Sequence, residues 1–159
     1  MKDQASNINQ QRNRILNSTK SGAFDLQGEG QDRQVTLAPT GNPPHSDPLI
    51  TAYWCPFVQG NVLPGFVDIP MHNPEHHYVF TAAMNGCALV TTSSPLGSNM
   101  LRVYHHQHPD SAHINNLIKA QGQTVISSIS ASDYCHNDQK IPAPNAFNFL
   151  FYKEGKWKY

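Results

Sequence analysis

Short runs rich in β-branched and aromatic residues fill the chain after residue 48, and this pattern constrains the fold more than any other feature. Each run is bounded by clusters of Pro, Gly, Asn and Ser, which interrupt strands and favour turns. The runs predict strands at residues 49–54, 62–67, 77–83, 87–92, 100–107, 124–131 and 146–152. A chain patterned in this way is expected to build its core from sheets.

One helix is predicted among these strands. The Asp110-Ser111 pair supplies an N-cap, and apolar residues recur at i, i+3 and i+4 as Ile114, Leu117 and Ile118 before Gly122 ends the segment. Strands and helix together predict an α+β domain. We expect a β-rich domain with a two-layer or sandwich-like mixed sheet core and one or two packed helices.

The composition changes near residue 48. Residues 1–48 are rich in Asn, Gln, Ser, Gly and Asp, and such a stretch buries too little apolar area to offset its ordering entropy. We expect a largely disordered polar leader, except for one helical turn at Ile15 and Leu16 and a short strand at residues 35–37. Residues 49–159 then form a single domain.

The charges and cysteines exclude several functional classes. With 11 basic and 11 acidic side chains, the chain lacks the positive charge that nucleic-acid binding requires, so we expect no nucleic-acid partner. No apolar stretch is long enough for a membrane span, and without an apolar segment after Lys2 we expect no secretory signal peptide. The three cysteines, Cys55, Cys87 and Cys135, lack CxxC spacing and are expected to be free thiols. We expect a monomer.

A β-hairpin within residues 81–106 brings a thiol and an imidazole together. Alternation places Cys87 and Leu89 on one face of the first strand, and Val103 and His105 on one face of the second. If the apolar residues set the register, Leu89 pairs with Val103 and Cys87 lies directly opposite His105. Directly opposed Cβ atoms are about 4.5–5.5 Å apart, within reach of a thiol–imidazole hydrogen bond.

Such a pair supports nucleophilic acyl transfer. The imidazole takes the thiol proton and stabilises the thiolate, and backbone N–H groups around Asn85 and Gly86 can bind a developing oxyanion. The alternative is that Cys87 is a small, buried packing residue on an apolar strand. If the hairpin slips, His106 replaces His105 as the base.

The residues around this pair resemble a known signature. Met84-Asn85-Gly86-Cys87, with Thr81 six residues before the cysteine and Tyr104-His105 on the returning strand, resembles the Leu-Ser-Gly-Cys motif of the bacterial glutamine deamidase superfamily. That superfamily includes the cytotoxic necrotizing factor catalytic domain, Burkholderia lethal factor and CheD. The resemblance implies that Cys87 is the nucleophile, His105 the base and acid, and Thr81 the group that orients the imidazole.

The resemblance also implies a reaction and a setting. The Cys87 thiolate attacks the carboxamide of a glutamine on a target protein, ammonia leaves with a proton from His105, and water hydrolyses the thioester to glutamate. An amine in place of water gives transglutamination. No cofactor is required. We expect a bacterial toxin or virulence effector that is secreted or injected by a non-Sec route and acts in the target-cell cytoplasm, with the bacterial cytoplasm as the alternative.

Other functions compete with the deamidase hypothesis. The chain is alternatively a non-catalytic binding or adaptor module, or a cysteine peptidase or acyltransferase that uses the same pair.

The string His72-Asn73-Pro74-Glu75-His76 matches the H-x-x-E-H pattern of zinc peptidases, which requires both histidines on one helix. Because Pro74 disfavours that helix, we expect no metal site. Cys135 and His136 are neighbours in the sequence, and neighbours on a strand point to opposite faces. We therefore do not expect them to form a second catalytic pair.

Overall fold

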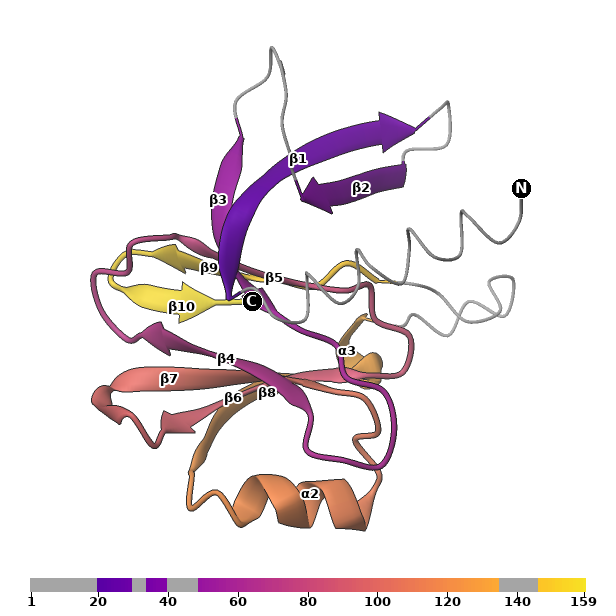
Figure 1. The fold of residues 1–159 in the computed structure, drawn as a ribbon, viewed down its shortest axis with the longest axis vertical. Helices are drawn as coiled ribbons and strands as arrows, with labels where there is room; N and C mark the ends of the chain where they lie inside the picture. The colour runs from indigo at the N-terminus through magenta and orange to yellow at the C-terminus, as the bar shows by residue number, and fades with distance from the viewer. Residues whose placement is uncertain (1–19, 30–33, 40–48, 135–145) are drawn as a thin grey trace.

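Two β-sheets face each other in the computed structural model, which describes residues 20–29, 34–39, 49–134 and 146–159 (Figure 1). The larger sheet has the order β10 (Lys156–Lys158), β9 (Leu150–Lys153), β5 (Tyr78–Thr81), β3 (Ile50–Cys55), β1 (Ser21–Glu29) and β2 (Gln34–Pro39). The smaller sheet has the order β4 (Gly65–Pro70), β7 (Gly97–His106), β6 (Ala88–Ser94) and β8 (Val125–Ile129). Neighbouring strands are antiparallel except β3 and β5, which are parallel.

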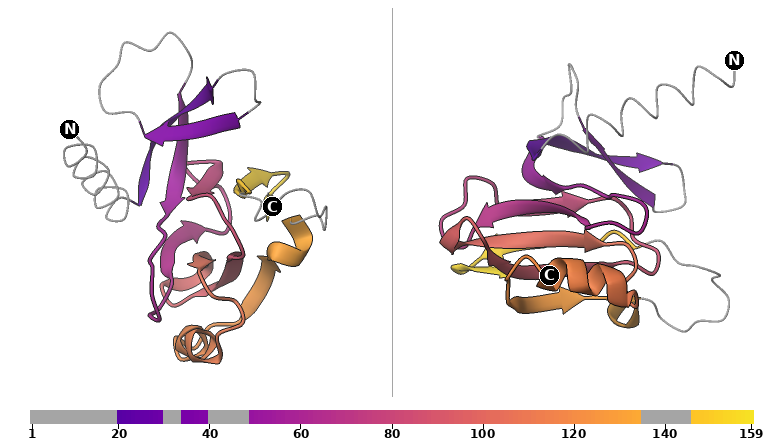
Figure 2. Two further views of the ribbon diagram at one scale, coloured as in Figure 1. Left: turned by 90° about the vertical axis from the view of Figure 1, so that its right-hand side faces the viewer. Right: turned by 60° about the horizontal axis from the view of Figure 1, so that its bottom comes forward.

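The predicted helix is confirmed as α2 (Ala112–Lys119). Ser111 is its N-cap and accepts a hydrogen bond from the backbone N–H of Ile114, as the sequence indicated. Its buried residues, Ile114 and Ile118, pack on the outer face of the smaller sheet (Figure 2). A second, four-residue helix, α3 (Ala131–Tyr134), follows β8. The expected β-rich α+β class with a mixed sheet is therefore confirmed.

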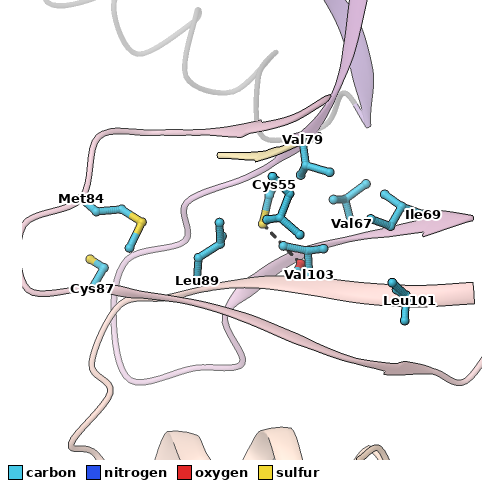
Figure 3. Packing of buried hydrophobic residues seen from close by; sticks show 10 residues of the cluster. Cys55, Val67, Ile69, Val79, Met84, Cys87, Leu89, Leu101 and Val103 are labelled. Atoms are coloured by element: carbon cyan, nitrogen blue, oxygen red, sulfur yellow. Dashed lines mark hydrogen bonds between the residues drawn. The ribbon is translucent and has the colours of Figure 1, made fainter. Parts of the chain in front are cut away.

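The principal core lies between the two sheets. Alternating residues of β4, β6 and β7 face those of β3, β5 and β9 across this layer, and the buried cluster consists of Cys55, Val67, Ile69, Val79, Met84, Cys87, Leu89, Leu101, Val103 and Leu150 (Figure 3). This layer is formed by side chains from strands far apart in the sequence. Of the site residues that the hairpin was expected to supply, Cys87 and His105 are positioned by contacts between the sheets.

Two strands lie within the stretch that was expected to be a leader. β1 pairs with β3, so that Phe24 lies opposite Ile50, and Phe24 is only 2% exposed. The short strand expected at residues 35–37 is part of β2. The sheet thus begins before residue 48, and Phe24 anchors β1 by packing with Trp54 and Phe80. The helical turn expected at Ile15 and Leu16 lies outside the described residues.

A buried ion pair supports the outer face of the smaller sheet. Asp68 on β4 and Arg102 on β7 lie opposite each other and form two hydrogen bonds of 2.8 Å, Nε to Oδ1 and Nη2 to Oδ2. The Ser94 hydroxyl donates a third bond to Asp68, and the guanidinium lies 3.9 Å from the centre of the Phe66 ring. Both charges are mostly buried, with 14% of the Asp68 side chain and 8% of the Arg102 side chain exposed.

Replacing Asp68 with Ala is expected to lower the free energy of unfolding by about 3–5 kcal/mol, because the Arg102 charge then stays buried without a partner. Urea denaturation measures the change. The matched control is Glu154→Gln, which removes the exposed Glu154–Lys158 pair and is expected to leave the urea midpoint nearly unchanged. Equal midpoints for Asp68→Ala and the wild type would contradict this role.

Candidate functional site

The hairpin register differs from the expected one by two residues. Leu89 pairs with His105, and Thr91 pairs with Val103. The turn is shorter than expected, since Ser94 pairs with Gly97, and a bulge follows Ser93. A shift of two residues keeps every side chain on its original face, so matching apolar faces cannot distinguish the two registers. Cys87 is therefore not opposite His105, and the predicted direct Cys87–His105 pairing is wrong.

His105 is held by the opposite sheet. Its Nδ1 lies 2.6 Å from the Thr81 hydroxyl on β5, while that hydroxyl donates to the backbone carbonyl of Cys55 at 2.7 Å. Because a hydroxyl has one hydrogen, Nδ1 must carry the proton and donate it to Thr81. Thr81 thus accepts a hydrogen bond from the imidazole, and the bond joins β7 of the smaller sheet to β5 of the larger one.

The other ring nitrogen of His105 is a buried acceptor. Nε2 carries a lone pair in this tautomer and has no hydrogen-bond partner among the described residues. The side chain is 0% exposed, and the Phe57 ring packs on it with the ring centres 5.0 Å apart. Burial lowers the pKa of His105 from 6.5 to about 4, and the nearby His106 contributes to this change. The imidazole is therefore neutral at pH 7.

Cys87 lies at one end of the core between the sheets. Its side chain points toward Met84 (Figure 3), only 8% of the residue is exposed, and the thiol is 3.9 Å from the backbone carbonyl of Gln107. Burial raises the pKa of the thiol, while the backbone N–H of Asn85 lowers it by a smaller amount. A thiol in this setting is protonated at neutral pH, as expected for a packing residue.

The two residues before Cys87 form an exposed turn. Asn85 and Gly86 are both exposed, and Gly86 has a φ of +79°. A β carbon at Gly86 would meet no atom within 4 Å, so the positive φ, rather than a close approach, accounts for the glycine. The Tyr134 hydroxyl donates to the Cys87 carbonyl at 2.7 Å. The predicted oxyanion support is thus an open loop, whereas the thiol beside it is buried.

Two buried residues near His105 were not predicted as site residues. Cys55, at the end of β3, donates from its thiol to the Val103 carbonyl at 3.3 Å, and burial raises its pKa to about 12. Gln107 follows β7 and donates to the carbonyls of Gly60 and Val62, which anchors the loop before β4. Cys55 is the free thiol that its spacing predicted, and no sequence pattern indicated a role for Gln107.

The remaining histidine candidates are separated. His106 points to the opposite face from His105, and its Nε2 lies 3.0 Å from the side-chain oxygen of Asn115 on α2. Residues 71–77 form the loop between β4 and β5, so His72 and His76 do not share a helix. In the described part of the chain, no three His, Cys, Asp or Glu residues come together as a metal site. Cys135 and His136 lie outside the described residues.

A group of aromatic side chains covers the outer side of the larger sheet. Its rings contact one another with centres 5.3–5.7 Å apart, and the members are Phe24, Trp54, Tyr78, Phe80, Phe147 and Phe149. Phe24, Trp54 and Phe80 are buried, whereas Tyr78 and Phe147 are 36% and 39% exposed. Aromatic residues at a surface are enriched in protein interfaces. Phe147 and Phe149, in the segment before β9, therefore contribute to an outer aromatic face, whereas Leu150 of β9 is buried between the sheets.

One protein family matches this chain. The family described as the Mcf1 activator-binding domain matches residues 6–159, almost the whole length. No curated protein matches the chain significantly. The matched segment includes both sheets and the hairpin with Cys87 and His105. Neither described helix is long and apolar enough to cross a membrane.

Acid is expected to destabilise the fold through His105. Because burial lowers its pKa from 6.5 to about 4, the unfolded chain binds more protons between these values, so stability falls as the pH drops through this range. The full shift corresponds to about 3 kcal/mol of unfolding free energy. An NMR titration of the His105 ring is expected to show the low pKa, and His105→Gln is expected to flatten the pH dependence of the urea midpoint. A His105 pKa near 6.5 would contradict this assignment.

Native alkylation is expected to be slow at Cys87. Because the thiol is buried and its pKa is raised, iodoacetamide at pH 6–7 should modify it more slowly than the same cysteine in the urea-unfolded chain. Peptide mass spectrometry measures the rates, and the fully buried Cys55 is the internal control. Modification of native Cys87 at pH 6 faster than in the unfolded chain would indicate an activated thiolate and refute a packing role.

Proposed function

This chain belongs to the Mcf1 activator-binding domain family, and on that premise we propose that it is a protein-binding module that recognises an activator protein. The family match carries the proposal, because it spans residues 6–159 and its description specifies binding. The partner is proposed to be a protein because the described surface exposes large apolar side chains.

The chemistry of the core supports binding over catalysis. His105 donates from Nδ1 to Thr81, and Cys87 packs beside Met84, so neither group is open to a substrate in this arrangement. Exposed apolar residues occur instead at the surface, with Tyr78 and Phe147 on the larger sheet and Val125 and Ile126 on the smaller one. Surfaces of this kind are typical of protein-interaction sites.

Affinity capture tests the proposal. The tagged chain is incubated with extracts of eukaryotic and bacterial cells, the enriched protein is identified by mass spectrometry, and the purified partner is titrated by calorimetry. We expect one partner that binds with a Kd of about a micromolar or tighter. The Cys87→Ala variant should capture the same protein with equal affinity. Absence of any protein enriched over the urea-unfolded chain would refute the proposal.

Glutamine deamidation is the second candidate function, because Thr81 bonds to His105 as the superfamily resemblance implies. For this reaction Cys87 and His105 must come into direct contact, whereas the hairpin register places Leu89 opposite His105. The partner protein is incubated with the wild type and with Cys87→Ala. Conversion of a glutamine to glutamate by the wild type alone, detected by peptide mass spectrometry, would establish the activity. An unmodified partner would refute it.

A further inference from the structure

β8 is an edge strand of the smaller sheet. It pairs with β6 on one side, and no strand among the described residues pairs with its other side. Its five residues, Val125–Ile129, include no charged residue and no proline. Proteins usually protect exposed edge strands with such residues, because unpaired backbone N–H and C=O groups recruit a further strand. β8 therefore has the backbone and the composition of a strand that accepts a partner.

The side chains of β8 are also open to a partner. Val125 and Ile126 are 56% and 54% exposed, and four of the five residues of β8 are exposed. A bulge between Thr91 and Thr92 on β6 makes Ile126 an extra residue that has no partner in the ladder. Figure 2 shows β8 at the margin of its sheet, beside α2. These aliphatic side chains would become buried if a strand were added to this edge.

An apolar groove runs along the inner side of β8. It has a volume of about 290 Å³ and lies between β8 of the smaller sheet and β10 of the larger sheet. Leu101, Leu150 and Trp157 line it together with Ile126. The Tyr159 hydroxyl reaches the inner face of β8, 3.2 Å from the Ser127 hydroxyl. The groove can receive alternate side chains of an added strand, since these all point to one face.

The side chains that line the groove favour a negatively charged group on the partner. Its lining includes His72 and Lys156 and no acidic side chain. Lys156 is exposed and forms no ion pair with another described residue. A second copy of the chain that paired through β8 would add another uncharged strand, which offers no charged group of its own to Lys156. A segment of a different protein in which apolar residues are followed by an acidic residue complements both the uncharged edge of β8 and the positive charge of Lys156.

We propose that β8 is the docking edge for the partner, which adds an extended apolar segment as a fifth strand and places an acidic residue near Lys156. This inference rests on the proposed binding function and specifies its site. Backbone hydrogen bonds to β8 supply affinity, and the groove selects apolar side chains at alternate positions. The aromatic group on the larger sheet is a weaker candidate, because three of its rings are already buried.

Three labelled peptides test the site by fluorescence anisotropy. The first is a short peptide of alternating valine and threonine that ends in aspartates, the second ends in lysines, and the third is the first peptide with N-methyl groups at alternate residues. We expect the aspartate peptide to bind the wild type and the N-methylated peptide not to bind. Ile126→Lys should weaken binding by about tenfold or more. The matched control Val62→Lys changes an aliphatic residue that is 47% exposed before β4, on the opposite edge, and should change binding by less than about twofold.

Several results would overturn the proposal. These are equal binding of the N-methylated peptide, equal effects of Ile126→Lys and Val62→Lys, or tighter binding of the lysine peptide. Sedimentation of the wild type as a dimer that Ile126→Lys dissociates would show that a second copy occupies the edge. Capture of the same protein by wild type and Ile126→Lys with equal affinity would overturn the β8 site and leave the binding function intact. Thermal unfolding by circular dichroism verifies that both variants fold.

Discussion

The hydrogen bond between His105 and Thr81 is the interaction on which the centre of the fold depends. It is buried, it joins β7 of the smaller sheet to β5 of the larger sheet, and Thr81 in turn donates to Cys55 on β3. A polar pair inside an apolar layer is favourable only when its groups are matched, so this bond specifies how the sheets are placed relative to each other. The same bond fixes the imidazole tautomer, while burial lowers the pKa of His105 and keeps the ring neutral.

The sequence predicted elements and faces better than it predicted distances. The spacing of Ile114, Leu117 and Ile118, with the cap at Ser111, defined α2 almost to the residue, because these signals are local. Alternation also placed Cys87 and His105 on the correct faces. Their separation along the ladder could not be obtained in this way, since pairing Leu89 with Val103 or with His105 gives the same faces. The register is set by the turn in which Ser94 pairs with Gly97. The sequence of this segment is compatible with turns of several lengths, so it did not predict the register.

The proposed binding function depends on the position of β8 in its sheet, which local sequence patterns do not predict. A run of uncharged residues at Val125–Ile129 predicts a strand, but whether that strand is central or at an edge depends on the sheet order, which is a long-range property. The same composition is harmless in a central strand and recruits another strand at an edge. The Cys87 thiol and the exposed edge of β8 also lead to two different hypotheses of function, glutamine deamidation and protein binding. In the account favoured by the family match, Cys87 packs the core while β8 and its groove present a surface to a protein partner.

Amide hydrogen exchange of the chain, alone and with its captured partner, tests this account most directly. Because the account places the partner at the unpaired edge of β8, the amides of Val125–Ile129 that do not bond to β6 should gain protection in the complex, while the turn at Asn85 and Gly86 keeps the exchange rate it has in the free chain. Protection that centres on residues 84–87 and leaves β8 unchanged would contradict the account and would place the partner at the Cys87 site.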